Sequence, residues 1–244
     1  MDSKTFFIQG CSHCSGAELP GDTGHGLVYD KSWPNKVATN LNAGEIVNRA
    51  SPGSSNDWII EDTINYVLDN KDKDIFVLLG FTGSDRIYLK HLAYQNSKPY
   101  GRAILTPGII DDKKFQDENL LTEHHDMYKS LLQTDWGTWH QIQLRFFRQV
   151  NYIQTFLQDN NIPHLFVTTI FPLDARYKKF GEFKWLYDKM DKKNLYGDFT
   201  KDTCYYEILK DKFKVNEMFH IGQEGQDHFA NLITEYITTN DLLH

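Results

Sequence analysis

Apolar residues fall into three short continuous runs that predict buried strands. The runs are TFFIQ at residues 5–9, DIFVLLG at residues 74–80 and PHLFVTTI at residues 163–170. They lack the alternation of a half-exposed strand, and continuous runs of this length are typical of central strands in a parallel sheet covered on both faces. We expect these three strands, with a weaker fourth at residues 36–41 or 45–49.

Residues with helical spacing separate these runs. Ser54, with Asp57 three positions later, resembles a capping box at the start of a helix whose apolar positions are Trp58, Ile60, Ile64, Val67 and Leu68. A second helical pattern covers residues 139–159 and ends before Pro163, and a third begins after Gly222. This order predicts an α/β fold, a three-layer α/β/α doubly wound sheet of mostly parallel strands, as in flavodoxin-like folds.

Two long segments interrupt this order. They cover about residues 81–135 and 171–214, and the second is rich in Lys, Asp and Tyr. Connections this long inside a compact domain are usually lids, extra helices or partner surfaces. With 244 residues in total, the sequence predicts one domain over residues 1–244 that carries these two insertions.

Composition narrows the class of partner. The chain has 26 basic and 33 acidic residues, a net charge of -7, and no basic cluster, so nucleic acid is not expected as a partner. No run reaches the length of a membrane span and the N-terminus lacks the apolar region of a signal peptide, so we expect no membrane partner and a cytoplasmic protein. Three cysteines do not make a disulfide framework and fit a reducing compartment. The sequence leaves the oligomeric state open.

The stretch GCSHCSG at residues 10–16 carries candidate chemistry. Cys11 and Cys14 have the spacing of zinc knuckles and of dithiol redox motifs, with His13 between them. A structural zinc needs four ligands, and there is neither a second Cys-x-x-Cys nor a Cys-x-x-His, while Cys204 stands apart. A redox dithiol at a helix start after a strand stays compatible with the sequence.

The same stretch also suits a serine nucleophile. Ser12 follows the first predicted strand, and open α/β sheets bind ligands at the carboxyl ends of their strands. Gly10 and Gly16 permit a tight turn whose backbone N–H groups face an oxyanion. The alternative without chemistry is a plain turn with a capping serine.

Four segments, taken in order, resemble the sequence blocks of the SGNH hydrolase superfamily, also called the GDSL-type esterases. GCSHCSG aligns with its first block, Gly-Asp-Ser-x-x-x-Gly, so that Ser12 falls on the nucleophile and Cys11 replaces the aspartate. NRASPGSSND supplies Gly53 as the second-block glycine. LLGFTGSD keeps Gly80 of the third block but has Thr82 in place of its asparagine.

The fourth block of the family is Asp-x-x-His before the C-terminal helix. EMFHIGQEGQDHFANLI provides Glu217 and His220 with that spacing. The variant forms of the blocks look most like SGNH-like proteins of phages and marine bacteria. If the chain comes from a phage, the resemblance also permits an association with the virion.

The resemblance implies roles for these residues. Ser12 would be the nucleophile, His220 its base and Glu217 the acid that orients the imidazole. The oxyanion would be bound by the N–H groups of Ser12 and Gly53 and by the hydroxyl of Thr82, with Ser84 as an added donor. The rival bases are His13, His25 and His228. This chemistry requires no cofactor and no metal.

The resemblance implies hydrolysis of carboxylic esters, often of acetyl groups on carbohydrates, so the expected substrate is a glycan ester or a small-molecule ester. Arg86 and Arg176 are candidates for binding a carboxylate or phosphate of the substrate. Trp136, Trp139, Trp185, Tyr187 and Tyr196 are candidates for stacking on sugars. The alternative function is a catalytically weak or inactive SGNH-like binding or structural protein, because Cys11, Thr82 and Glu217 depart from the family pattern.

Overall fold

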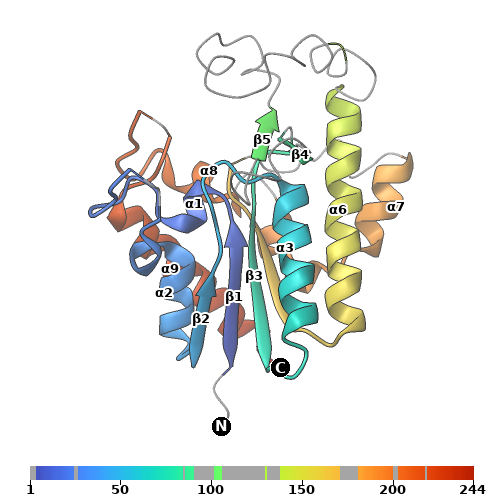
Figure 1. The fold of residues 1–244 in the computed structure, drawn as a ribbon, viewed down its shortest axis with the longest axis horizontal. Coiled ribbons are helices and arrows are strands. Elements are labelled where there is room, and N and C mark those ends of the chain that lie inside the picture. Colours follow the sequence, from blue (N-terminus) through green and yellow to red (C-terminus); the bar gives the residue numbers. More distant parts are fainter. Residues whose placement is uncertain are drawn as a thin grey trace.

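The centre of the computed structural model is a parallel sheet (Figure 1). Its strands are β1 (Thr5–Gly10), β2 (Glu45–Asn48), β3 (Ile75–Phe81) and β6 (His164–Thr168), in the order β2-β1-β3-β6. The pairs run in register from Thr5 opposite Glu45 and from Thr5 opposite Ile75, and every pair is parallel. The structure describes residues 4–24, 27–84, 86–90, 102–105, 130, 138–170, 181–199, 203–217 and 219–244.

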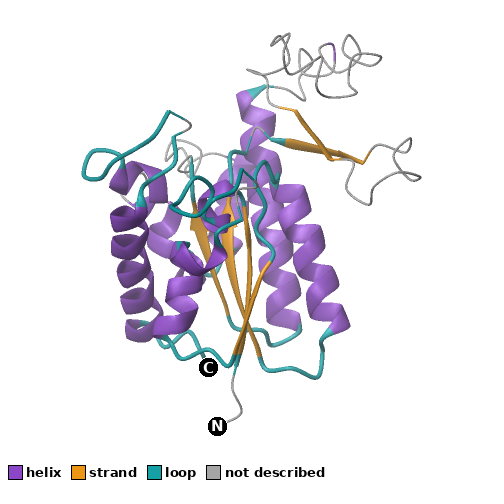
Figure 2. Ribbon diagram, turned by 60° about the vertical axis from the view of Figure 1, so that its left-hand side comes forward, coloured by secondary structure: helices purple, strands orange, loops and turns teal. Residues whose placement is uncertain are grey.

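Helices cover both faces of this sheet (Figures 1 and 2). α3 (Asn56–Asp69), α6 (Trp139–Asp159) and α7 (Gly181–Lys189) lie on one face, and α2 (Trp33–Asn40) packs with α9 (Gln223–Thr239) on the other. The shorter elements are α1 (Ser12–Ser15), η1 (Tyr29–Lys31), η6 (Lys192–Asn194), η7 (Tyr196–Phe199), α8 (Tyr205–Leu209) and the antiparallel pair β4 (Ile87–Lys90) and β5 (Arg102–Leu105).

The continuous apolar runs supply two hydrophobic cores because successive side chains point to opposite faces. Phe7 and Val77 belong to the core beneath α3 and α6, whereas Phe6 and Leu78 belong to the core beneath α2 and α9. Both cores exclude water, so the middle positions of these strands are apolar, and buried polar residues such as Gln9 and Thr168 lie near the strand ends. The predicted three-layer doubly wound fold, the three predicted strands and the helix over residues 139–159 are confirmed. The expected central position is correct for β1 and β3, whereas β6 lies at the edge of the described four-stranded sheet.

The two candidates for the fourth strand have different outcomes. Residues 45–48 form β2, but residues 36–41 lie largely in α2, so the strand prediction there is wrong. Ser32 precedes this helix, Pro34 occupies its first turn, and Trp33, Val37 and Ala38 make one buried stripe. Such a stripe has helical spacing, which a short apolar window does not distinguish from a strand.

The start of α3 lies one residue later than the predicted capping box. Ser55 is the N-cap, and its hydroxyl accepts a hydrogen bond from the Trp58 N–H at 3.3 Å. The Ser54 hydroxyl instead donates to the Ser51 carbonyl at 2.8 Å. Ser54 and Ser55 both have side chains that suit an N-cap, and the turn that precedes α3 places Ser55 at that position.

The two predicted insertions contain several of the shorter elements. β4 and β5 lie in the first, and α7, η6, η7 and α8 lie in the second. His25, Trp136 and Arg176 lie outside the described residues. Within the described ranges, no helix is both long and apolar enough to cross a bilayer.

Candidate active site

Four chain segments meet at the carboxyl edge of the sheet, the upper edge in Figure 1. α1 follows β1, the Gly53 loop follows β2, Thr82 follows β3, and the segment with His220 precedes α9. The chain leaves β1 towards β2 on one side and returns to β3 on the other, so the strand order reverses between β1 and β3. Open α/β sheets bind ligands at this kind of switch point.

Ser12 is the first residue of α1, directly after Cys11 as its N-cap. The helix is a single turn that ends at Gly16, whose φ of 79° lies in the left-handed region, and the residue carries no side chain that would strain there. Ser12 is 8% exposed. No other group in the described part of the chain hydrogen-bonds its hydroxyl, which is thus available to a substrate or a base.

The glycines around α1 make room for a cysteine. A Cβ built on Gly10 would lie 2.5 Å from Cys14 Sγ, and one on Gly80 would lie 2.2 Å from it. Gly10 is the last residue of β1, so its role is close packing rather than the predicted tight turn. Burial raises the pKa of the Cys14 thiol well above its usual value, which makes that thiol a poor nucleophile.

Metal ligands do not cluster in the described residues. No group of three His, Cys, Asp or Glu side chains in these ranges could hold a metal ion. Cys11 Sγ instead lies 3.4 Å from Thr169 Oγ1, after β6. Packing against neighbouring strand ends therefore accounts for Cys11 and Cys14.

The Gly53 loop is tied to β1 and to Thr82. The Ser51 N–H donates to the Gly10 carbonyl at 3.1 Å, and Gly53 has a left-handed φ of 75°. Asn56, the first residue of α3, accepts a hydrogen bond from the Thr82 N–H at 2.9 Å and donates to its carbonyl at 3.3 Å. These bonds fix the ends of β1 and β3 and the Gly53 loop relative to one another.

Thr82 presents a buried hydroxyl without a partner. The residue is 3% exposed, and within the described residues its Oγ1 makes no hydrogen bond. Ser84, the added donor expected from the sequence, accepts from Gln143 Nε2 at 3.0 Å. A buried hydroxyl without a hydrogen bond destabilises a protein by about 1–3 kcal/mol, so a bound ligand that accepts a hydrogen bond from Thr82 would remove this cost.

His220 lies just before α9 and contacts α1 through His13. The two rings meet edge to face with centroids 5.0 Å apart. His220 Nδ1 lies 3.0 Å from Glu18 Oε2, in the loop after α1. Ser12 and His220 are not hydrogen-bonded to each other in the structure. Glu217 is exposed, so its predicted role as the acid partner stays a prediction.

The rival base His13 is buried, and its pKa is lowered to about 3. Burial is the main cause, and the nearby His220 and Arg86 add to it. At neutral pH its imidazole is therefore uncharged and a weak proton acceptor. Arg86, the predicted substrate-binding residue, donates to the Ser54 carbonyl at 3.4 Å beside the Gly53 loop. His228 instead packs against Phe213.

A family model described as a family of unknown function (DUF6071) matches residues 18–243. The chain belongs to this family. The match covers Gly53, Thr82 and His220 and begins after Ser12. No curated protein sequence matches the chain.

Solved structures similar to this DUF6071 chain align over nearly its whole length. The crystal structure of TesA covers 97% of this chain and 99% of its own, with 10% identity and a TM-score of 0.51. The esterase EstA from Pseudoalteromonas sp. covers 97% of both chains (11% identity, TM-score 0.49), and a catalytic mutant of Axe2, an acetylxylan esterase from Geobacillus stearothermophilus, covers 96% of this chain and 94% of its own (12%, 0.48). At this identity the comparison with TesA shows the SGNH-like fold and not an activity.

Two residues of this DUF6071 chain that connect the segments at the carboxyl edge of the sheet were not identified from the sequence. Asn56 lies within the quoted NRASPGSSND stretch, but no local pattern distinguishes its bridge to Thr82 from an ordinary first helical turn. Glu18 lies beyond the first block, and its contact with His220 joins positions separated by 202 residues. Local spacing carries no signal for either contact.

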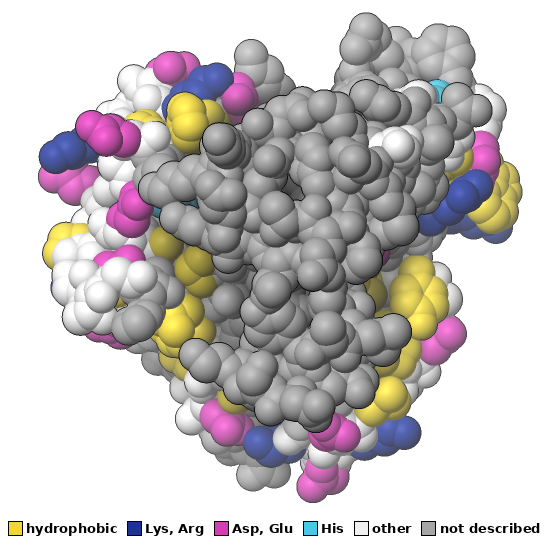
Figure 3. Space-filling view, turned by 45° about the horizontal axis from the view of Figure 1, so that its top comes forward, with side chains coloured by type: hydrophobic (Ala, Val, Ile, Leu, Met, Phe, Trp, Pro, Cys, Tyr) yellow, Lys and Arg dark blue, Asp and Glu magenta, His cyan; other side chains and the backbone are white. Residues whose placement is uncertain are grey.

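The surface seen in Figure 3, which looks towards the carboxyl edge, shows no gathered basic patch among the described side chains. Lysine and arginine alternate there with aspartate and glutamate.

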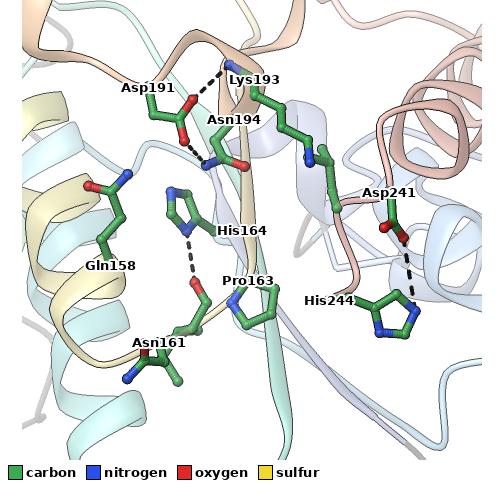
Figure 4. Close-up of a pocket in the computed structure, with 11 residues that line it drawn as sticks. Gln158, Asn161, Pro163, His164, Asp191, Lys193, Asn194, Asp241 and His244 are labelled. Atoms are coloured by element: carbon green, nitrogen blue, oxygen red, sulfur yellow. Dashed lines mark hydrogen bonds and ion pairs between the residues drawn. The ribbon is translucent and has the colours of Figure 1, made fainter.

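A pocket of about 360 Å³ lies at the other edge of the sheet (Figure 4). His164, the first residue of β6, points into it, together with side chains that include Gln158, Asn161, Asp191 and Asn194. His164 Nδ1 donates to the Ile162 carbonyl at 2.8 Å. Because this pocket is at the amino end of β6, it is separate from the edge that carries Ser12.

Proposed function

We propose that this chain is a serine hydrolase that cleaves carboxylic esters, with Ser12 as nucleophile and His220 as general base. The observation that supports this proposal is the meeting of four distant segments at one edge of an SGNH-like sheet. Contacts link β1 to the Gly53 loop, that loop to Thr82 through Asn56, and α1 to His220 through His13.

In the proposed reaction, Ser12 Oγ attacks the ester carbonyl carbon while His220 Nε2 accepts its proton. The N–H groups of Ser12 and Gly53 and the Thr82 hydroxyl donate to the oxyanion. Collapse of the tetrahedral intermediate breaks the bond to the alcohol, which takes the proton from His220. Water, deprotonated by His220, then attacks the acyl-enzyme, and Ser12 recovers its proton as the acid leaves.

The choice of His220 over His13 follows from their surroundings. A base works best when its pKa lies near the working pH, and His13 has a pKa of about 3. His220 has a carboxylate at Nδ1, which leaves Nε2 to accept a proton. The bond from Ser12 to His220 then forms with substrate, since such bonds often tighten only in the Michaelis complex.

For the substrate we propose an acetyl ester of a glycan or of a small molecule. Phe219 precedes His220, is 65% exposed, and its ring lies nearly perpendicular to that of Tyr206 with centroids 6.3 Å apart. An exposed aromatic ring beside the base offers a face on which a sugar ring stacks. Arg86, near His13, would bind an acidic group of the substrate.

The test is hydrolysis of p-nitrophenyl acetate together with labelling by a fluorophosphonate probe. We expect turnover by the wild-type protein and one covalent adduct per chain, located by peptide mass spectrometry on Ser12. A properly folded protein that neither turns over the ester nor takes up the probe contradicts the proposal. That result favours the alternative, a non-catalytic SGNH-like module, which the replacements at Cys11 and Thr82 suggest.

Replacing Thr82 with valine is expected to lower kcat about 10²–10³-fold, the usual loss for one oxyanion donor. The two side chains have nearly the same shape, and the lost hydroxyl is buried without a partner in the described structure. The free energy of unfolding should therefore stay the same or rise. Steady-state kinetics and urea unfolding measure both quantities.

The control for this prediction is Thr82→Ser, which keeps the hydroxyl. It should retain most of the activity although it loses a buried methyl group. Equal kcat values for Thr82→Val and wild type would exclude Thr82 from the oxyanion site.

A further inference from the structure

The carboxylate that contacts His220 comes from the opposite end of the chain. Glu18 Oε2 lies 3.0 Å from His220 Nδ1, and the His220 side chain is 14% exposed. We infer that Glu18, rather than Glu217, is the positioning residue that orients the catalytic imidazole. This inference rests on the proposed function and deepens it, because it assigns the third member of the site.

Asn216 holds both partners of this contact. Its side-chain amide donates to the same Glu18 oxygen, Oε2, and its Oδ1 accepts from the His220 backbone N–H at 2.8 Å. The three residues thus form a closed set of hydrogen bonds between the loop after α1 and the segment before α9. The Glu18 side chain is 39% exposed, and a carboxylate fixed by two donors is better preorganised than one without a partner.

The backbone on both sides of the contact is held in an uncommon conformation. Glu18 has a φ of 60° and Phe219, next to His220, has a φ of 64°. Non-glycine residues in the left-handed region are disfavoured, and they gather where surrounding structure serves a site. The Glu18 N–H is held by Asp22 Oδ2 at 2.7 Å, which stabilises the loop in this form.

Glu217 does not share this geometry. The expectation for Glu217 required the acid and the imidazole to lie on one side of a helical segment. Instead, the Asn216 N–H donates to the His220 carbonyl at 3.1 Å, and Glu217 is exposed. Among the described residues, no hydrogen bond or ion pair joins Glu217 to His220, whose Nδ1 lies beside Glu18 instead.

The inferred role is electrostatic and geometric. The Nδ1–H group donates to Glu18, which fixes the tautomer that leaves Nε2 available to Ser12. When His220 accepts the serine proton, the Glu18 carboxylate stabilises the imidazolium without taking the proton itself.

The experiment compares Glu18→Gln with Glu217→Gln, two exchanges that each remove one negative charge and keep the side-chain length. We expect Glu18→Gln to lower kcat for p-nitrophenyl acetate about 10²–10⁴-fold with little change in KM, since replacing the acid of such a triad by its amide costs up to about 10⁴. Glu217→Gln should stay within about twofold of wild type. Glu18→Asp, which keeps the charge, should recover part of the loss.

A second readout separates orientation from general stability. The Nδ1 proton of His220 should give a downfield proton NMR signal in wild type and in Glu217→Gln, and that signal should move upfield or vanish in Glu18→Gln. If instead Glu217→Gln loses activity and the signal while Glu18→Gln keeps both, the inference is overturned and the proposed hydrolase function stands. A wild-type protein that hydrolyses no ester and takes up no probe overturns both.

Discussion

Replacing Ser12 with alanine is expected to lower kcat for ester hydrolysis by up to about 10⁶-fold, the scale found when the nucleophile of a serine triad is removed. The substitution deletes the atom that forms the acyl-enzyme, and neither His13 nor a buried thiol such as Cys14 replaces it. The oxyanion donors remain, so a residual rate above that of water is expected. The measurement is steady-state turnover of p-nitrophenyl acetate at enzyme concentrations high enough to detect that residual rate.

The fold should survive this change. No other described group hydrogen-bonds the Ser12 hydroxyl, so its loss leaves no buried partner unsatisfied. Ser15→Ala is the matched control on the same helix, because Ser15 is buried and its hydroxyl donates to the Ser12 carbonyl at 3.2 Å. The control should keep turnover and cost about 1 kcal/mol of stability. Equal rates for Ser12→Ala and wild type would remove Ser12 from the mechanism.

The sequence was enough to predict the sheet because its signal is local. A strand buried on both faces is mostly apolar along its length, so the runs that became β1, β3 and β6 needed no tertiary information. The helix over residues 139–159 had a long stripe with helical spacing, and its predicted bounds match α6. The strand prediction at residues 36–41 was wrong because six residues are too few to distinguish the spacing of a helix from that of a strand.

The candidate site was only partly predictable, for a physical reason. Ser12, Gly53 and Thr82 follow strands of a parallel sheet, and that topology alone places them at one edge. The contacts of Glu18 with His220 and of Asn56 with Thr82 depend on how loops from different crossovers pack. Such packing leaves no periodic trace in either loop.

The same distinction explains the stretch GCSHCSG. Its residues are compatible with a redox dithiol, with a pair of metal ligands or with a turn that presents a nucleophile, and local spacing does not distinguish these three interpretations. In the structure, Cys14 Sγ occupies the space beside Gly10 and Gly80. A side chain at either glycine would collide with the sulfur atom, so both positions require glycine. In this stretch, both the Ser12 hydroxyl and His13 Nδ1 are without a hydrogen bond among the described residues. The lowered pKa of His13 makes it a weak proton acceptor, which leaves Ser12 as the candidate for chemistry.

Acidification is expected to destabilise the protein through His13. Its pKa is about 3 in the folded chain against an ordinary value of 6.5. Between these values the unfolded chain binds more protons than the folded one, so the free energy of unfolding rises with pH and falls as pH is lowered below about 6.5. At about 1.4 kcal/mol per pH unit, His13 contributes a loss of about 4 kcal/mol between roughly pH 7 and pH 3.5.

The surroundings of the His13 ring cause this loss of stability. His13 is buried against Tyr205 and Tyr206, and the cationic forms of His220 and Arg86 would repel a second positive charge there. Protonation therefore requires the side chains packed around α1 to move apart. Since His13 follows Ser12 directly, the same opening would displace the nucleophile, so the loss of stability and the loss of activity should share one pH range.

The measurement is urea unfolding of wild type and His13→Leu at several pH values between about 7 and 3.5. An uncharged leucine fills a similar space, so the variant should lose a large part of the pH slope, while the slope due to buried His164, whose pKa is also lowered by burial, remains in both proteins. His244→Leu is the control, because His244 is 82% exposed and should leave the slope unchanged. Identical slopes for His13→Leu and wild type would mean that the imidazole gains its proton without unfolding, which contradicts a closed, dry environment around α1.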